Sequence, residues 1–291
     1  SSSTQPSSST TPSSSTKPSS NADDITIPNA ETDFEWVDVT AIGAINHSFA
    51  STDGVIITNY KGTRKNVNIP STLGGKKVLG IADGKADPDG FLNFLSGPFL
   101  NKGLTQVQLP NTLEYIGGGA FEGNKLTSIT IPSSVTEIGR LAFESNQLAT
   151  ANIPDSVTSI SPYAFMGNQL TSITIPKGLT TIDFGVFSGN ALTSVTIPTG
   201  VTSIGEGAFW VNQLTSVNIP NSVTSISESA FSYNNLTSIS IPASVTRVGD
   251  YAFMDNQLTS VSIPDNVTSI GFQSFSSNPL LASSYQPTSP K

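Results

Sequence analysis

A strict 22-residue repeat limits the fold of this 291-residue chain more than any other feature of the sequence. A representative unit, LTSITIPSSVTEIGRLAFESNQ, runs from Leu126 to Gln147. Its apolar residues alternate in SITI and again in the β-branched piece VTEI, so each unit predicts one clear strand and one shorter strand. Proline ends the first strand because it cannot donate to a ladder. The repeat is carried by Pro110, Pro132, Pro154, Pro176, Pro198, Pro220, Pro242 and Pro264 and by Phe121, Phe143, Phe165, Phe187, Phe209, Phe231, Phe253 and Phe275.

Such short units become stable only by stacking, since one unit cannot bury its own apolar face. We therefore expect a solenoid in which the phenylalanines plug the interior. An invariant asparagine separates successive units, and its amide can bond the backbone of its own turn and of a neighbouring turn. We interpret this column as a structural ladder and not as a ligand site: Asn124, Asn146, Asn168, Asn190, Asn212, Asn234, Asn256 and Asn278. Gly139 and its equivalents favour a tight bend after the second strand, although Ser161, Asp183 and Ser227 replace glycine elsewhere, so positive φ is not required there.

The segments that flank the repeats predict four parts. Residues 1–22 are nearly pure Ser, Thr and Pro and read as an extended linker, and residues 282–291 return to a similar composition. Residues 23–103 are expected to form an N-terminal β-rich cap with irregular first repeats, in which Trp36 is a core residue. Residues 104–281 are expected to form the solenoid of eight repeats.

Composition excludes several classes of protein. There are 13 basic and 21 acidic residues, which give a net charge of -8, so nucleic acid is an unfavourable partner. The chain has no cysteine, and therefore neither disulfides nor thiolate metal sites. It has no apolar run of 18 residues and no signal peptide, so we expect a mature fragment without a transmembrane segment.

The pattern of AF, then Asn, then LTSVTIP with VTSIG following resembles the BspA-like leucine-rich repeats of surface proteins from bacteria and some protists. The resemblance covers Leu104 to about Leu281, and Val55–Ile81 resembles the degenerate first repeat of that family. It implies a mainly β, right-handed leucine-rich-repeat solenoid with a concave sheet, and a role in adhesion or surface recognition. Many family repeats are one residue longer and carry cysteine where this chain has Asn124, so neither curvature nor thiol chemistry is carried over.

Residues that could carry chemistry are few, and we expect no enzyme, no cofactor and no metal site. His47 is the only histidine and is expected to be a cap residue. Three carboxylates share one column on successive repeats and are interpreted as solvated side chains and not as a catalytic pair: Glu206, Glu228 and Asp250. Asp83, Asp87 and Asp89 lack the spacing of an EF-hand, so a polar turn is favoured over a calcium site.

Two sets of residues are the candidates for ligand binding. The first occupies variable positions of the segment GxxAFxxN, where large apolar groups either anchor a partner or pack against adjacent rungs: Tyr163, Phe184, Trp210, Tyr233, Tyr251 and Phe272. The second is the row of small hydroxyl residues that point outward from the main strand: Ser128, Thr130, Ser172, Thr174, Ser194 and Thr196.

The leading functional hypothesis is an extracellular, secreted or surface-attached module that binds a macromolecular partner, either a protein or a polysaccharide of a cell surface or matrix. A first alternative is a carbohydrate-binding module tethered to a polysaccharide-degrading enzyme by the Ser/Thr/Pro linker. A second alternative is an ice-binding solenoid, which would use the threonine rows of the main strand and would require a flat sheet.

Overall fold

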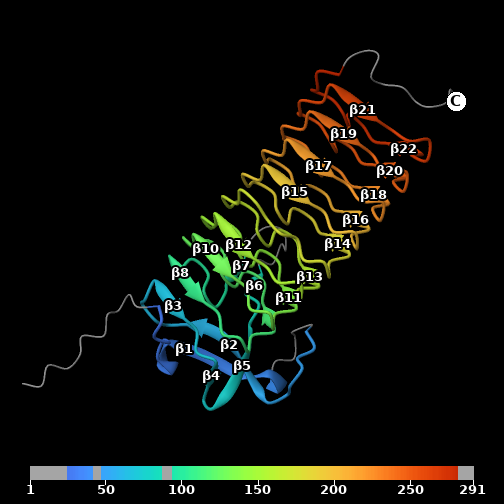
Figure 1. Cartoon of the computed structure of the whole chain (residues 1–291). Helices are drawn as coiled ribbons and strands as arrows, with labels where there is room; N and C mark the ends of the chain where they lie inside the picture. The colour runs from blue at the N-terminus through green and yellow to red at the C-terminus, as the bar shows by residue number, and fades with distance from the viewer. Residues whose placement is uncertain (1–24, 42–46, 87–93, 281–291) are drawn as a thin grey trace, which may run out of the picture.

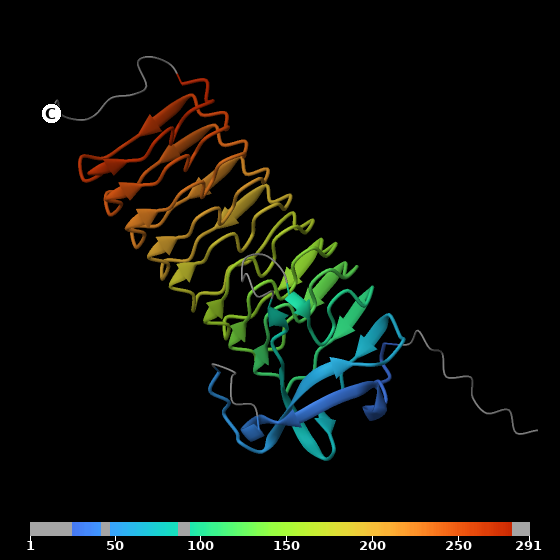
Figure 2. The same ribbon diagram turned by 180° about the vertical axis from the view of Figure 1, so that it is seen from behind.

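The computed structural model describes residues 25–41, 47–86 and 94–280, so the predicted linkers 1–22 and 282–291 lie outside the described residues. Within these ranges the chain is almost entirely β-structure, with a cap at one end and a stack of rungs extending from it as a nearly straight rod (Figures 1 and 2). The predicted class, a mainly β leucine-rich-repeat solenoid, is confirmed. The rod does not display the concave sheet that the family resemblance implies.

A rung contributes two strands and a turn, except that the rung of residues 170–191 has only the second strand. The first strands are three residues long and define what we call the strand face: β3 (Asn66–Asn68), β8 (Gln106–Gln108), β10 (Ser128–Thr130), β12 (Thr150–Asn152), β15 (Ser194–Thr196), β17 (Ser216–Asn218), β19 (Ser238–Ser240) and β21 (Ser260–Ser262). The second strands are two residues long: β9 (Tyr115–Ile116), β11 (Glu137–Ile138), β13 (Ser159–Ile160), β14 (Thr181–Ile182), β16 (Ser203–Ile204), β18 (Ser225–Ile226), β20 (Arg247–Val248) and β22 (Ser269–Ile270). Strands of successive rungs pair in parallel, and the repeat sets the register, as in Ser128 opposite Thr150. The segment GxxAFxxN closes each rung, and we call it the turn side.

The cap continues the sheet of the second strands. Its elements are η1 (Glu31–Asp33), β1 (Phe34–Asp38), η2 (Val39–Ala41), β2 (Gly54–Tyr60), β4 (Thr72–Leu73), β5 (Lys76–Ile81), β6 (Lys85–Ala86) and β7 (Phe94–Ser96). β1 is antiparallel to β2, whereas β2 and β5 are parallel and β5 pairs with β9 of the first rung. The cap therefore covers the apolar end of the stack, and Trp36 is partly buried against the core.

The phenylalanines form one continuous column through the interior. Phe121 and Phe143 are fully buried, and their ring centroids are 5.3 Å apart with nearly parallel planes. The column begins earlier than the predicted boundary at residue 104, because Phe99 stacks on Phe121 at 4.9 Å and Tyr60 stacks on Phe99. Large rings in offset contact bury much apolar surface at every rung interface, which stabilises the stack.

The predicted asparagine ladder is confirmed. Asn146 Nδ2 donates to the carbonyl of Phe121 on the preceding rung at 2.9 Å and to the carbonyl of Phe143 on its own rung at 3.1 Å. The backbone N–H of Leu126 donates to Asn146 Oδ1 at 3.1 Å. One buried amide therefore satisfies backbone groups of two rungs, and such groups are costly to leave unpaired.

Glycine at position 139 is explained by a close approach between rungs. A Cβ at Gly139 would lie 2.5 Å from the backbone nitrogen of Gly118 on the rung before. Its φ is not in the left-handed region, as the replacement of this glycine in other rungs had indicated.

The second-strand ladder stops at one rung interface, between β13 and β14. At the same interface, residues 172–174 do not pair with β12, and their isolated bridge, Thr174 to Thr196, leads to the following rung. The centroids of Phe165 and Phe187 are 6.0 Å apart here. The turn side remains bonded across the interface, since the N–H of Phe165 donates to the carbonyl of Val186 at 3.1 Å.

A side-chain contact that joins several other rungs is absent at this interface, as it is at Gly200, where β14 and β16 nevertheless pair. In several rungs a serine after the proline clamps the rung before it, as when Ser156 Oγ donates to the carbonyl of Val135 at 2.9 Å. Gly178 occupies this place at the interrupted interface and has no hydroxyl to donate. The ion pair of Lys177 Nζ and Asp155 Oδ2, at 3.0 Å, links the two rungs at the proline corner instead.

We predict that Asn234→Ala lowers the free energy of unfolding by about 2–4 kcal/mol. It leaves the buried N–H of Leu214 without its acceptor and removes one of the two asparagine amides that bond the carbonyls of Phe209 and Phe231. The control is Asn235→Ala at the adjacent, exposed position, which should change stability by less than about 0.5 kcal/mol. Urea denaturation measures both, and equal effects would contradict the structural role of the ladder.

We predict that Gly200→Ser is more stable than Gly200→Ala by about 0.5–1.5 kcal/mol. A Cβ at Gly200 would lie at ordinary contact distance, 3.5 Å, from the carbonyl oxygen of Leu179, so a serine hydroxyl there can form the clamp that Ser244 makes with the carbonyl of Val223 at 2.7 Å. Thermal unfolding of the two variants tests this, and identical melting temperatures would show that no clamp forms.

Candidate recognition surfaces

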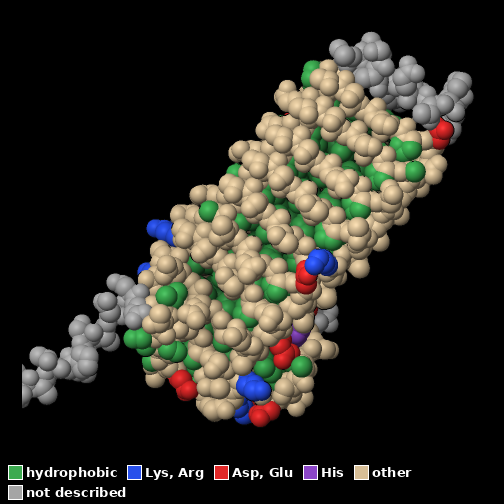
Figure 3. Space-filling view, in the orientation of Figure 1, with side chains coloured by type: hydrophobic (Ala, Val, Ile, Leu, Met, Phe, Trp, Pro, Cys, Tyr) green, Lys and Arg blue, Asp and Glu red, His purple; other side chains and the backbone are tan. Residues whose placement is uncertain are grey.

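The strand face is uncharged and hydroxylated. All six predicted strand-face candidates are exposed: Ser128, Thr130, Ser172, Thr174, Ser194 and Thr196. Figure 3 shows few charged side chains over the rungs in this view, and most of the charged ones lie near the cap. This face therefore offers many weak hydrogen-bonding groups and no dominant electrostatic feature.

The backbone of the strand face is interrupted at intervals. Its strands pair two by two, as β3 with β8, β10 with β12, β15 with β17 and β19 with β21. Inward residues beside the interruptions are half-buried, namely Val107, Ala151 and Val217. A shallow depression of about 330 Å³ lies between β8 and β10 and is lined in part by Val107, Ile129 and Thr130. The backbone pairing under the hydroxyl rows is consequently not continuous along the stack.

The turn side has a different constraint, since two of its positions in every rung are left-handed. Their φ values lie between 50° and 67°. The first column is Gly119, Leu141, Tyr163, Gly185, Gly207, Ser229, Tyr251 and Gln273, and the second is Asn101, Gly123, Ser145, Gly167, Gly189, Val211, Tyr233, Asp255 and Ser277. Left-handed backbone costs an L-residue roughly 1–2 kcal/mol, which explains the many Gly, Ser, Asn and Asp residues. Bulky residues in these columns need another explanation.

Packing explains Tyr163 and Phe184. Their ring centroids are 4.6 Å apart, and both side chains are half-buried. The Tyr163 ring also fills the space over Gly185, where a Cβ would lie 2.6 Å from its Cδ1 atom, and the Arg140 guanidinium is 5.7 Å from the ring centroid. These two residues therefore contribute to contacts between rungs.

Tyr251 and Phe272 form a second aromatic pair near the C-terminal end of the described stack. Their rings are perpendicular at 5.6 Å. Tyr251 is half-buried, whereas Phe272 is 63% exposed. Phe272 is therefore the more accessible ring of this pair.

Packing does not explain the third group, which we call the aromatic patch: Trp210, Val211 and Tyr233. These side chains are 40%, 41% and 48% exposed. The rings of Trp210 and Tyr233 meet edge to face, with centroids 6.2 Å apart and planes at 87°. Val211 and Tyr233 occupy the second left-handed column, at φ 51° and 56°. A β-branched residue in this region is a genuine outlier, so Val211 combines backbone strain with apolar exposure.

Sequence reasoning selected Trp210 and Tyr233 but missed Val211. Its signal was present in the sequence, because the preceding rungs place Gly167 and Gly189 in the same column. A valine at a position held by glycine in neighbouring repeats indicates a residue that the backbone does not favour.

A column of carboxylates runs along the same turn side. Glu206, Glu228 and Asp250 are exposed on three successive rungs. Partial burial raises the pKa of Glu206, and the nearby charge of Glu228 raises it further. Asp250 Oδ1 also accepts the N–H of Phe272 at 2.7 Å.

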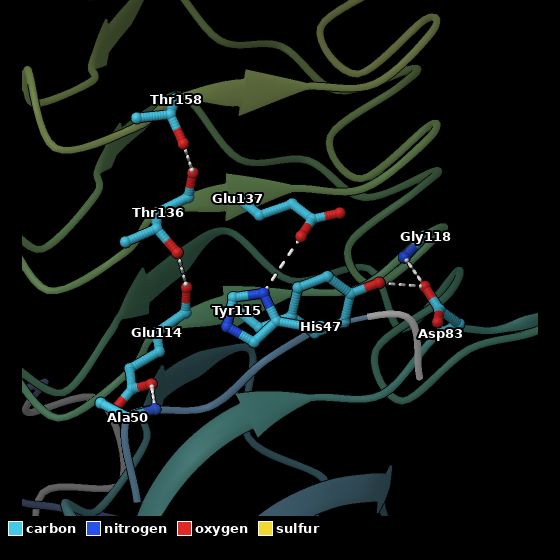
Figure 4. A network of polar contacts seen from close by, with 9 residues as sticks. All are labelled: His47, Ala50, Asp83, Glu114, Tyr115, Gly118, Thr136, Glu137 and Thr158. Carbon is cyan, nitrogen blue, oxygen red and sulfur yellow. Dashed lines mark hydrogen bonds and ion pairs between the residues drawn. The ribbon is translucent and has the colours of Figure 1, made fainter. Parts of the chain in front are cut away.

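His47 attaches a cap segment to the first rungs. Its Nδ1 lies 3.0 Å from Glu137 Oε2, and its ring stacks on Tyr115 with centroids 5.0 Å apart (Figure 4). Nearby, the N–H of Ala50 donates to Glu114 Oε2 at 2.7 Å. His47 Nε2 is buried and has no hydrogen-bond partner among the described residues. The imidazole is thus packed away from solvent, as expected of a cap residue.

Asp83 belongs to the same network. Tyr115 donates its hydroxyl to Asp83 Oδ1 at 2.7 Å, and the N–H of Gly118 donates to the same oxygen at 2.6 Å. Burial, followed by the hydrogen bond to Asp83, raises the pKa of Tyr115. Asp87 and Asp89 lie outside the described residues, so the turn in which they occur is not described. Among the residues with assigned positions, no group of three or more His, Cys, Asp or Glu side chains is placed to hold a metal ion.

The comparisons with known proteins agree with this architecture. A family model described as the BspA type leucine rich repeat region, in six copies, matches residues 95–215 and 202–289. No curated protein matches the chain.

Two solved structures illustrate the fold. A leucine-rich repeat protein from Bacteroides ovatus is 24% identical, with a TM-score of 0.52 over 79% of this chain and 67% of its own. Another from Eubacterium ventriosum is 23% identical, with a TM-score of 0.50 over 69% of this chain and 57% of its own. The chain thus spans little more than half the length of the second protein.

We predict that Val211→Gly raises the free energy of unfolding by about 1 kcal/mol, since glycine relieves the left-handed strain at a modest entropic cost. Val211→Ala is the control, because it removes exposed apolar atoms but keeps a Cβ. Urea denaturation should rank the glycine variant above the alanine variant, and the reverse order would show that position 211 is not strained.

Proposed function

Because the chain belongs to the BspA-type leucine-rich repeat family, we propose that it is a non-catalytic recognition module that binds a macromolecular partner through the surface of its solenoid. Leucine-rich-repeat solenoids are extended scaffolds whose regular faces suit protein contacts. The family match thus favours a protein as the partner. A location on the cell surface or outside the cell is part of this proposal.

One observation carries the proposal, namely that the aromatic patch is unfavourable for folding. Trp210 and Tyr233 expose large rings, and Val211 holds an outlying backbone conformation, although glycine or serine serves in equivalent places. Neither feature contributes to the buried core of the solenoid. Exposed Trp and Tyr residues are, however, the side chains that dominate binding energy at protein interfaces.

Carbohydrate binding is the second candidate, and the same patch favours it. Aromatic rings are stacking platforms for sugars. The rings of Trp210 and Tyr233 stand at 87°, so they form a corner suited to a single sugar ring and not a flat platform for a crystalline polysaccharide. Ice binding draws less support, because the strand pairing on the hydroxyl face is interrupted. Within the described ranges, no helix has the length and apolar character needed to cross a lipid bilayer.

The test uses the whole chain, immobilised and exposed in turn to purified matrix proteins, insoluble cellulose and insoluble chitin. We predict that the double variant Trp210→Ala/Tyr233→Ala weakens binding to the partner at least about tenfold, which corresponds to 1.4 kcal/mol. Biolayer interferometry measures binding to the proteins, and co-sedimentation measures binding to the insoluble polysaccharides.

The control is Ser194→Ala/Ser216→Ala on the strand face, which should leave binding unchanged. Equal loss in both double variants would place recognition elsewhere, and loss confined to cellulose or chitin would favour the carbohydrate alternative. Thermal hysteresis of ice growth would instead support the ice-binding alternative.

A further inference from the structure

The aromatic patch lies in the acidic part of the solenoid. From residue 178 to residue 280 the chain has one basic residue, Arg247, and six acidic residues, a net charge of -5: Asp183, Glu206, Glu228, Asp250, Asp255 and Asp265. Asp255 follows Tyr233 directly in the second left-handed column. The surroundings of the patch therefore favour a cationic partner.

The carboxylates nearest the patch in the repeat form no ion pair with a described basic side chain. In the described part of the molecule, Glu206, Glu228, Asp250 and Asp255 do not lie within 4.0 Å of any basic side-chain nitrogen. Glu206 precedes Trp210 by four residues on one rung, and Glu228 precedes Tyr233 by five on the next. Each of these two consecutive rungs thus carries one acidic and one aromatic residue of the turn side.

A shallow depression beside this column adds a place for a side chain. It has a volume of about 290 Å³ and is lined in part by Glu228, Asp250, Gly249 and Arg247. Arg247 is exposed and forms no ion pair within 4.0 Å with Glu228 or Asp250. The depression is therefore lined by two acidic groups and one basic group. The local charge still attracts a cation.

We infer that the C-terminal half of the turn side binds a basic, extended segment of a protein, with an arginine or apolar side chain against the Trp210–Tyr233 corner and further basic side chains along Glu206, Glu228 and Asp250. This inference rests on the proposed function and names the chemistry of its partner. The guanidinium group suits the site because it stacks on aromatic faces and also bonds carboxylates in a fork. A neutral sugar would make no use of the carboxylate column as a source of charge attraction.

The experiment measures binding of the whole chain to a fluorescent peptide in which arginines alternate with threonines around a central leucine. A matched peptide has glutamate in place of each arginine. We expect the arginine peptide to bind and the glutamate peptide not to bind, with affinity falling as salt rises because exposed charges are screened.

Three variants test the two halves of the site. Trp210→Ala/Tyr233→Ala and Glu206→Gln/Glu228→Gln/Asp250→Asn should each weaken binding of the arginine peptide about tenfold, whereas Arg247→Gln should strengthen it severalfold by removing the one local cation. Ser194→Ala/Ser216→Ala serves as the control, and the unfolding curve of each variant verifies that it is folded.

The outcomes separate this inference from the proposed function. If the arginine peptide does not bind, or binds the acidic-column variant as well as the wild-type chain, the basic partner is refuted. If the basic partner is refuted but Trp210→Ala/Tyr233→Ala still abolishes binding to a matrix protein or a polysaccharide, the patch remains the recognition site and only the proposed partner is wrong. If Trp210→Ala/Tyr233→Ala loses neither binding to the arginine peptide nor binding to a matrix protein or polysaccharide, both the inference and the proposed function are refuted.

Discussion

The inward-facing amide of one asparagine per rung is the interaction on which the solenoid depends. Each amide donates to the phenylalanine carbonyl of its own rung and to that of the rung before, and it accepts the N–H of the leucine that begins its own rung. These bonds hold the Ala-Phe turn at a fixed height and so align the buried rings. Where the β13–β14 pairing is absent, Asn168 and Asn190 keep these bonds and the rungs stay attached along the turn side. The strand pairing is thus the part of the structure that can be interrupted.

The same arrangement determines which residues are free to vary. The turn that directs the Ala-Phe pair inward has a left-handed residue on each side of the pair. The first directly precedes the alanine, and the second follows the phenylalanine by two positions. Small or turn-favouring residues satisfy that backbone at low cost. A large residue there either packs against the next rung, as Tyr163 does over Gly185, or remains exposed, as Tyr233 does. The variable columns consequently distinguish residues that serve folding from residues that do not.

Much of this fold was predictable because the repeat is exact in proline, phenylalanine and asparagine, each of which has one plausible structural role at its position. Phe99 was missed although it precedes Phe121 by 22 residues, because Lys102 stands where the asparagine column would continue and Pro70 and Pro110 are 40 residues apart. The left-handed columns were not predicted, since residues such as Val211 and Tyr251 conceal the glycine preference. The contact of His47 with Glu137 joins residues 90 positions apart, and no local pattern encodes it. The interruptions of strand pairing leave no residue pattern that identifies them, since Gly178 and Gly200 are equivalent positions and only the first lies where the second-strand ladder stops.

The position of the aromatic patch follows from this division of roles. Trp210, Val211 and Tyr233 lie on the turn side, where the N–H of Val211 donates to the carbonyl of Ser232 at 3.1 Å and that of Tyr233 to the carbonyl of Met254 at 2.9 Å. Their backbone is therefore held on the uninterrupted part of the solenoid and not on the strand face, where pairing is broken. A binding site whose side chains are already positioned loses less conformational entropy on association. Exposed rings on the most regular part of the stack can thus contribute most of the binding energy through a few residues. The neutral hydroxyl face is then free to remain hydrated.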